Sequence, residues 1–507
     1  MSKFHSTVSR RDFMKGLGLA GAGLSAAAAA APVFHDLDEV IAHPLAKVNH
    51  PWWVKERDLK DPTCELDFST MKRYSQTLHM FDPNAFKRAV DSAEWDRMLH
   101  SNFALFGMNM VKNMNEGRPG FALRDVTLAS AAGFGHDIYG MKGNFVAPRL
   151  VMRPEDYGVP RWQGTPEENT RMLRAALRVY GGRDMGVVPL DQDTRKLVYH
   201  VEEDYIPYEF EDVPKGYETH PDPNPPPFEN YDPNSPETDY CNMKYKRVIP
   251  TSKQMYIVSW NSQESPEMHK QGNVHIGATS YTLAYADGRI EINRLQQFIE
   301  GIGYEALGEP HWNDLCHSSG TGVMAGIAET SRMSLTNISP RFGSGTRTWK
   351  LITDLPLAPT HPIDAGIFKF CHTCKICADA CPSGAVSKES EPSWDIVAPN
   401  NSPGCKNYYY NGVKCLTWWN DGGQACFICN AVCPFLEKGK AHIHSLIKGT
   451  VAITPIFNGF FANMEKAFGF DYRHQAYDVD YEQPSVDWWE LDLPEKGWDS
   501  SRSVKDY

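Results

Sequence analysis

The stretch FCHTCKICADACP, residues 370–382, is the most informative part of this chain. It spaces four cysteines as C-x2-C-x2-C-x3-C-P, the pattern with which bacterial ferredoxins hold [4Fe–4S] clusters. A second, shorter motif follows in ACFICNAVCPF, residues 425–435. A zinc ribbon or a disulfide framework is the alternative, but zinc sites usually pair two C-x2-C units and lack the x3-C-P ending. The pattern therefore predicts electron transfer through two clusters.

The spacing also assigns ligands, because the fourth cysteine of such a run binds the other cluster. Cluster 1 is expected to take three cysteines of the first motif and the last of the second: Cys371, Cys374, Cys377 and Cys433. Cluster 2 is expected to take the exchanged cysteine and the other two of the second motif: Cys381, Cys426 and Cys429. Its fourth ligand must come from upstream, where Cys415 and Cys405 are the candidates. Cys415 is preferred because it is nearer to the second motif.

The remaining cysteines do not extend either motif. Cys64, Cys241 and Cys316 are scattered along the chain, as is whichever of Cys405 and Cys415 binds no cluster. Isolated cysteines are most often small buried side chains. We therefore predict no metal-binding or catalytic role for them.

The N-terminus carries an export signature. Residues 9–15, SRRDFMK, contain a pair of arginines, and an apolar Gly/Ala-rich segment follows from Gly16 to about Ala31. That segment falls short of the roughly 20 residues that span a bilayer. We predict that residues 1–31 are a twin-arginine signal peptide, with the cleavage site left open. Because no other segment is long and apolar enough to span a membrane, the mature protein is expected as a soluble domain at the outer face of the cytoplasmic membrane, held there by a partner.

Composition indicates a globular enzyme. The chain has 507 residues, and about 475 remain after the predicted signal peptide, enough for two or three domains. A net charge of -12 and the lack of a basic stripe argue against binding of nucleic acid. Thirteen tryptophans are a high number. Aromatic side chains often line an apolar pocket or a flat cofactor site, although packing of the core accounts for most of them by default.

Three segments carry clear secondary-structure signals. In GTPEENTRMLRAALRVYGG, residues 164–182, Thr165 is the expected N-cap, Pro166 the first helical residue and Gly181 the end. MYIVSW, residues 255–260, is a candidate buried strand. Residues 278–307 predict a helix that runs through Ile299 and ends near two glycines, Gly301 and Gly303.

Taken together, the chain resembles the respiratory reductive dehalogenases, and the resemblance covers essentially its whole length. It rests on the export signal, on the two-cluster module and on GSGTRTWKLITD, residues 343–354. PRWQGTPEENT at 160–170 and FIEGIGY at 298–304 are also similar to the family. MKGLGLAGAG and FHDLDEV, near the N-terminus, look closest to the enzymes of chloroethene-respiring bacteria.

The resemblance implies an α+β fold. Residues 151–360 would form a nitroreductase-like α/β domain that binds a base-off corrinoid and the substrate, and residues 361–450 a bacterial ferredoxin-like domain with two [4Fe–4S] clusters. Residues 32–150 would be an N-terminal region and residues 451–507 a C-terminal tail that packs on the core. The corrinoid-binding pattern Asp-x-His-x-x-Gly is absent. That absence agrees with base-off, histidine-off binding, and equally with a chain that binds no corrinoid.

The resemblance also implies an activity and its residues. The enzyme would replace chlorine by hydrogen on a small chlorinated organic compound, with chlorinated ethenes favoured, as the terminal step of anaerobic organohalide respiration. Tyr285 would donate the proton, and Arg347 beside it would lower the pKa of the phenol. Asn313 matches a third catalytic residue, to within two positions, across an apparent insertion (EPHW). Tyr281 and Lys350 are candidates for contact with the cofactor. A small integral-membrane anchor protein and a membrane-associated electron donor would be the partners.

Two other functions stay open. An enzyme like the epoxyqueuosine reductases would also combine a corrinoid with two clusters, but those enzymes act on transfer RNA in the cytoplasm, against the export signal and the acidic charge. A non-catalytic, exported two-cluster subunit for electron transfer is the second alternative. Corrinoid absorbance in the purified protein would separate that subunit from an enzyme.

Overall fold

A computed structural model describes residues 50–133, 143–203, 205–219, 245–269, 271–272, 274–436, 443–467 and 489. The predicted signal peptide, Cys241 and most of the C-terminal tail lie outside the described residues. The described residues all belong to one compact unit. The functional divisions proposed at residues 150, 360 and 450 therefore stay predictions, and the last of them falls inside a helix, Ile443–Ile453.

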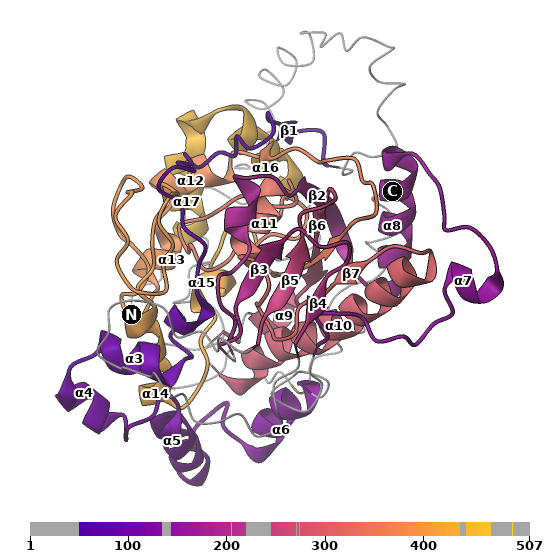
Figure 1. The fold of residues 1–507 in the computed structure, drawn as a ribbon. Helices are drawn as coiled ribbons and strands as arrows, with labels where there is room; N and C mark the ends of the chain where they lie inside the picture. The colour runs from indigo at the N-terminus through magenta and orange to yellow at the C-terminus, as the bar shows by residue number, and fades with distance from the viewer. Residues whose placement is uncertain are drawn as a thin grey trace. The chain divides into compact units, whose positions relative to one another are not determined.

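In the described part of the chain, four antiparallel strands form the central sheet in the order β2-β6-β8-β7 (Figure 1). Their bounds are Arg183–Pro189 for β2, Tyr256–Gln263 for β6, Ala306–Leu307 for β7 and Thr346–Thr353 for β8. The strand predicted at 255–260 is confirmed as β6 and continues to Gln263. Its register with β8 places Ser262 opposite Arg347.

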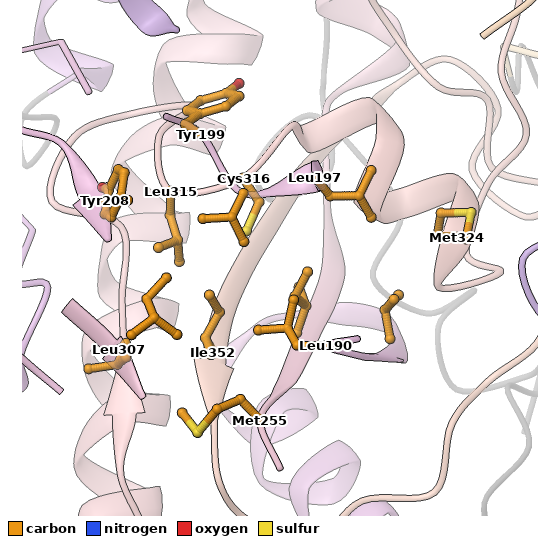
Figure 2. Packing of buried hydrophobic residues seen from close by; sticks show 14 of the residues in the cluster. Leu190, Leu197, Tyr199, Tyr208, Met255, Leu307, Leu315, Cys316, Met324 and Ile352 are labelled. Atoms are coloured by element: carbon orange, nitrogen blue, oxygen red, sulfur yellow. The ribbon is translucent and has the colours of Figure 1, made fainter. Parts of the chain in front are cut away.

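Side chains of this sheet alternate between two apolar faces, as the two-residue period of a strand requires. On one face, Val258 and Leu351 pack with the apolar sides of helices α8 and α10. On the other face, Ile257 and Ile352 pack with Met324 of helix α11 and with the small sheet β3-β5-β4. Figure 2 shows this second face, where the predicted small buried Cys316 lies close to Leu315. The elements span Pro166–Tyr180 (α8), His275–Gly301 (α10), Ser318–Met324 (α11), Tyr208–Glu211 (β3), Tyr217–Glu218 (β4) and Arg247–Pro250 (β5).

Helix α8 begins and ends where the sequence predicts. The Thr165 hydroxyl accepts a hydrogen bond from the backbone N–H of Glu168 at 3.2 Å, and Gly181 ends the helix at a left-handed φ of 116°. The second predicted helix, α10, ends at Gly301 and is also confirmed. It lies so close to the sheet that a Cβ on Gly288 would come within 1.9 Å of the Trp349 ring. Glycine at this position therefore lets α10 approach β8.

The two cysteine motifs lie on short helices with loops between them. These helices are α12 (Ile367–Thr373), α13 (Ile376–Asp379), α14 (Gly412–Gly422) and α15 (Ile428–Ala431). Helix α12 lies beside α16 (Ile443–Ile453) and α17 (Asn458–Ala467), as Figure 1 shows. Val451 and Phe461 from these two helices are buried against Phe370 of α12. This part of the C-terminal region therefore packs on the first cysteine motif.

The N-terminal segment runs back over the C-terminal half of the chain. Strand β1 (Lys55–Glu56) pairs with β9 (Ile363–Asp364), and Leu66 forms an antiparallel bridge with Cys405. Helix α5 packs on α14, and α6 packs on α10. The other elements are α3 (Pro83–Ala89), α4 (Ser92–Arg97), α5 (Ala104–Asn115), α6 (Leu123–Ala132), α7 (Pro154–Tyr157), α9 (Pro266–His269), η1 (Gln76–Leu78), η3 (Thr194–Leu197) and η4 (Pro455–Phe457). Within the described ranges, no helix combines the length and apolar character of a membrane span.

Candidate active site and cysteine cavities

The three residues predicted to be catalytic come together where α10 meets the start of β8. The Tyr285 hydroxyl accepts a hydrogen bond of 2.8 Å from Nδ2 of Asn313. The guanidinium carbon of Arg347 lies 4.6 Å from the centre of the Tyr285 ring. The phenol therefore has an amide donor on its oxygen and a cation over its ring. The resemblance to the family left the asparagine uncertain by two positions, and the structure places Asn313 at the hydroxyl.

Aromatic rings fix the orientation of Tyr285. Trp312 and Trp349 contact it edge to face, with ring centres 5.4 and 5.8 Å away. Tyr281, one helical turn earlier, makes a third perpendicular contact at 6.1 Å. Such edge-to-face contacts are the favoured geometry for aromatic pairs. The hydroxyl is thereby held in one direction by a nearly buried ring.

A buried carboxylate holds Arg347, and the sequence did not single it out. Nε of Arg347 donates to Oε1 of Glu264 at 3.0 Å, and one Nη forms an ion pair with the same oxygen at 2.9 Å. The other oxygen of Glu264 is 2.8 Å from Nε2 of His269. Burial alone would raise the pKa of the Glu264 carboxyl, but the Arg347 charge and the His269 hydrogen bond lower it overall. Burial alone would lower the pKa of Arg347, but the negative charge of Glu264 helps to raise it overall. The pair therefore stays ionised.

A large cavity opens in front of Asn313 and Arg347. Its empty volume, which includes open solvent at the mouth, is about 1550 Å³. The walls come from residues 62–79, 317–337 and 400–410, which are far apart in sequence. Uncharged polar side chains are frequent in the lining: Ser318, Ser319, Thr330, Ser334, Thr336, Asn337, Asn400, Asn401, Ser402 and Asn407. Tyr285 lies behind this wall and reaches it through its hydrogen bond to Asn313.

The cysteines of the two motifs surround two smaller cavities, which we call cavity 1 and cavity 2. Cavity 1 is lined by the four cysteines assigned to cluster 1: Cys371, Cys374, Cys377 and Cys433. Cavity 2 is lined by Cys381, Cys415, Cys426 and Cys429. Cys405, the other candidate, lies instead on the wall of the large cavity, in an apolar cluster with Cys64. The structure therefore groups Cys415, and not Cys405, with the second motif.

The three cavities are neighbours. Leu335 and Tyr410 line both the large cavity and cavity 2, and Met333 lines both cavity 2 and cavity 1. Phe427, between two cysteines of cavity 2, stacks on Tyr281 with ring centres 4.6 Å apart. Cavity 2 therefore lies between cavity 1 and the large cavity.

Comparison with known proteins identifies the family. Residues 49–357 match the protein family described as "Reductive dehalogenase subunit". The chain belongs to the reductive dehalogenase family. It is 33% identical to the chloroethene reductive dehalogenase of Dehalococcoides mccartyi strain VS, over 98% of this chain and 99% of that protein. It is 32% identical to a trichloroethene reductive dehalogenase from another strain of that species, over 98% of each chain. This reductive dehalogenase is therefore an oxidoreductase.

The fold is shared with a solved structure. The catabolic reductive dehalogenase NpRdhA superposes on 86% of the present dehalogenase with a TM-score of 0.57 at 17% identity. The match spans 52% of the NpRdhA chain, so this dehalogenase covers about half the length of that protein. The likeness confirms a mixed helix-and-sheet fold of the kind that reductive dehalogenases have.

Two residues predicted to contact a cofactor lie at different places in the dehalogenase. Lys350 is fully buried and pairs with Oε1 of Glu309 at 3.0 Å, and it donates to Ser318, which lines the large cavity. Burial raises the pKa of Glu309 to about 7, against the opposing charge of Lys350. Tyr281 contacts Phe427, which lines cavity 2. Their roles toward a cofactor stay predictions.

The chemistry of the eight cysteines suits iron–sulfur clusters. Burial raises the pKa of Cys371 and of Cys415 to about 12, and a nearby metal is among the groups that lower the pKa of a thiol. Nowhere in the described ranges do three possible ligands converge on one point, as a single metal ion requires. In each of the two small cavities, four cysteines belong to one lining. This arrangement is compatible with iron–sulfur clusters.

Sequence patterns did not reveal two buried charged residues, Glu264 and Arg332, that lie beside the predicted ones. Glu264 begins the segment after β6, and its backbone N–H bonds the Gly345 carbonyl, so it lies just beyond the Ser262–Arg347 pair. The only signal for it is that a buried arginine requires a carboxylate partner. Arg332, on the wall of cavity 1, carried no signal because no motif includes it.

Proposed function

We propose that this dehalogenase replaces chlorine by hydrogen on small chlorinated organic compounds, with chlorinated ethenes as the preferred class. It would serve as the terminal reductase of anaerobic organohalide respiration. Two full-length relatives named for chloroethene and trichloroethene support the substrate class. The observation that carries the proposal is the phenol of Tyr285, which is bonded to Asn313 and lies under the Arg347 guanidinium. Asn313 and Arg347 both line the large cavity.

We propose that the large cavity holds a base-off corrinoid. The edge of a corrin ring carries many amides, and the uncharged polar lining offers hydrogen-bond partners for such groups. One solved reductive dehalogenase of similar fold is described as suggesting a mechanism for B12-dependent dehalogenation. When bound, a corrinoid supplies the low-potential cobalt centre at which a carbon–chlorine bond is broken. A nitroreductase-like corrinoid domain at 151–360 and a ferredoxin-like domain at 361–450 are part of this proposal.

The histidines that line the large cavity support a histidine-off mode. Burial lowers the pKa of His79 and of His317 to about 4, so both imidazoles are neutral at pH 7. The Nδ1 atom of each accepts a backbone N–H bond, from Phe81 and Gly320 respectively. A neutral imidazole that accepts at Nδ1 carries its hydrogen on Nε2. Neither histidine therefore presents a free Nε2 lone pair to a metal.

The residues around Tyr285 are arranged for proton donation. Replacing chlorine by hydrogen consumes two electrons and one proton and releases chloride. Asn313 donates to the phenol oxygen, and the hydrogen that the Tyr285 hydroxyl itself carries would be the proton passed to the substrate carbon. After the transfer, the phenolate is stabilised by the Asn313 amide and by the charge of Arg347. Glu264 keeps that guanidinium in place.

We propose that cavity 1 and cavity 2 hold two [4Fe–4S] clusters, called cluster 1 and cluster 2. Electrons would pass from a membrane-associated donor through cluster 1, then cluster 2, to the large cavity. The shared lining residues Met333, Leu335 and Tyr410 support this order. Export by the twin-arginine route and attachment to the outer face of the cytoplasmic membrane through a small integral-membrane anchor complete the proposal. The signature at residues 9–15 supports the route.

The test is Tyr285→Phe, assayed by methyl-viologen-driven dechlorination of a panel of chlorinated ethenes, ethanes, phenols and benzenes. General acid catalysis contributes about 10²–10⁴-fold, so turnover should fall by that factor while iron and cobalt contents stay unchanged. Tyr304→Phe is the matched control. Its hydroxyl bonds the Trp162 carbonyl in the same core but away from the cavity, so its turnover should remain near that of the wild type.

Two results would contradict the proposal. Near-normal turnover of Tyr285→Phe would exclude Tyr285 as the proton donor. A reconstituted protein with about eight irons and no cobalt would exclude the corrinoid and favour a plain electron-transfer subunit.

A further inference from the structure

Cavity 1 contains a buried cation that the proposed chemistry does not use. Arg332 is 1% exposed, and its guanidinium lies 3.9 Å from the centre of the Tyr408 ring. Nε and one Nη donate to the Cys371 carbonyl, at 2.9 and 2.7 Å. The other Nη donates to the carbonyls of Ser387 and Glu389, at 2.9 and 2.6 Å. These close partners are all neutral.

The charge of Arg332 has no carboxylate within ion-pair distance among the described residues. A buried ion without a counter-ion is strongly unfavourable. Arg332 lines cavity 1 together with Cys371, Cys374, Cys377 and Cys433. A [4Fe–4S] cluster with four cysteine ligands is net negative in both oxidation states, because its thiolates outweigh the charge of the core. A negatively charged cluster in cavity 1 would therefore supply the counter-ion that the Arg332 guanidinium lacks.

Cavity 2 has a different electrostatic environment. Its lining contains no lysine, arginine or histidine among the described residues, and Trp418, Trp419 and Tyr410 are prominent in it. Cavity 1 has one further cation, Lys375, but this side chain is half-buried and its ammonium bonds the Lys388 carbonyl near the surface. Solvent screens such a charge far more than a buried one. The buried cation is thus a feature of cavity 1.

We infer that Arg332 is the counter-ion of cluster 1 and raises its reduction potential above that of cluster 2. The inference rests on the two clusters of the proposed function. Reduction adds one electron to a cluster and changes no bond, and the donor in the test is dithionite. The added negative charge is stabilised by a nearby buried cation, and net charge is among the factors that set these potentials. Cluster 1 would therefore hold the incoming electron before it moves on to cluster 2.

The test is a redox titration of the purified holoenzyme, followed by electron paramagnetic resonance. Arg332→Met should shift the higher-potential step downward by at least tenfold in its equilibrium constant, which is 59 mV for one electron. The lower-potential step should move less. Arg332→Gln, which keeps an amide donor for the Cys371 carbonyl, should give the same shift. Arg332→Lys keeps the charge and should stay within threefold of the wild type, as should the screened control Lys375→Met.

The outcomes separate this inference from the proposed function. Protein without clusters would overturn the proposed function itself. Neutral variants that contain about eight irons could leave the higher-potential step in place, or shift only the lower-potential step. Either result overturns the role of Arg332 and leaves the proposed function standing. If both neutral variants fail to assemble cluster 1 while Arg332→Lys succeeds, the counter-ion role is supported. If Arg332→Lys fails as well, Arg332 serves only to hold the loop, and the inference is wrong.

Discussion

At the scale of single residues, the site depends on a row of side chains that each orient the next. His269 holds Glu264, Glu264 holds Arg347, and Arg347 lies over Tyr285. Glu264 and His269 are fully buried and lie outside the lining of the large cavity. Glu264 is thus a positioning residue for the guanidinium that, in the proposed mechanism, would stabilise the phenolate.

Glu264→Gln tests this role. The substitution leaves Arg347 in place but removes its counter-charge, so kcat should fall by about 10–100-fold, as it does for comparable supporting residues, with a smaller change in KM. Breaking a buried ion pair should also cost about 3 kcal/mol of stability. Glu300→Gln is the control, because it breaks a buried pair with Arg153 at the far end of α10. It should lower stability without the loss in kcat, and equal kinetic losses in both variants would contradict the role.

At the scale of elements, the start of α12 is tied to the rest of the molecule by one carboxyl group. Glu329 accepts hydrogen bonds from the backbone N–H groups of Ala365 and Ile367, at 2.9 and 3.0 Å. Its other oxygen accepts from the Thr63 hydroxyl at 2.7 Å. Burial raises the pKa of Glu329 to about 7. The helix that carries the first cluster motif therefore depends on a group that titrates near neutral pH.

This pKa predicts a pH dependence of stability. The pKa of Glu329 in the folded protein lies above its ordinary value near 4.5. The contribution of the protonated Glu329 carboxyl to the free energy of unfolding is therefore complete below pH 4.5 and is lost as the pH rises toward 7. Glu329→Gln stays neutral and should flatten that decline. Denaturation midpoints of both proteins between pH 4.5 and 8 provide the measurement. Parallel curves for the two proteins would show that Glu329 does not titrate in this range.

At the scale of the whole molecule, three cavities in contact make one route from a cysteine motif to a phenol. The route crosses from residues 371–377, through the second motif, to α10 and β8. Cavity 2 is central to it, because it touches both the large cavity and cavity 1. Whether Cys415 binds the cluster proposed for cavity 2 therefore decides whether the route is continuous.

Cys415→Ser should lose cluster 2, so the iron content should fall from about eight to about four per chain, and dechlorination should stop. Cys405→Ser is the matched control, because Cys405 lies with Cys64 on the wall of the large cavity. It should keep all of its iron. Iron analysis and electron paramagnetic resonance of the reduced proteins provide the measurement, and the reverse result would make Cys405 the ligand.

What the sequence predicts well is local. The spacing of the cysteines assigned four ligands to one cluster and three to the other, leaving Cys415 and Cys405 as candidates for the eighth. The cap at Thr165 placed the start of a helix. Both signals depend on neighbours along the chain. Tyr285 and Arg347 came from resemblance to a family. Glu264 and Arg332 could not be found in this way. Arg332 is 39 residues from its carbonyl partner Cys371, and Glu264 meets Arg347 only through the pairing of β6 with β8.

The bridge between Leu66 and Cys405 joins two segments that are synthesised at very different times. Residues 62–79 leave the ribosome long before residues 400–410, yet both form the wall of the large cavity. A nascent chain therefore has no complete chamber, and pairing across such a separation is slow. We expect the cofactor to bind after the complete polypeptide has folded, and not to nucleate folding.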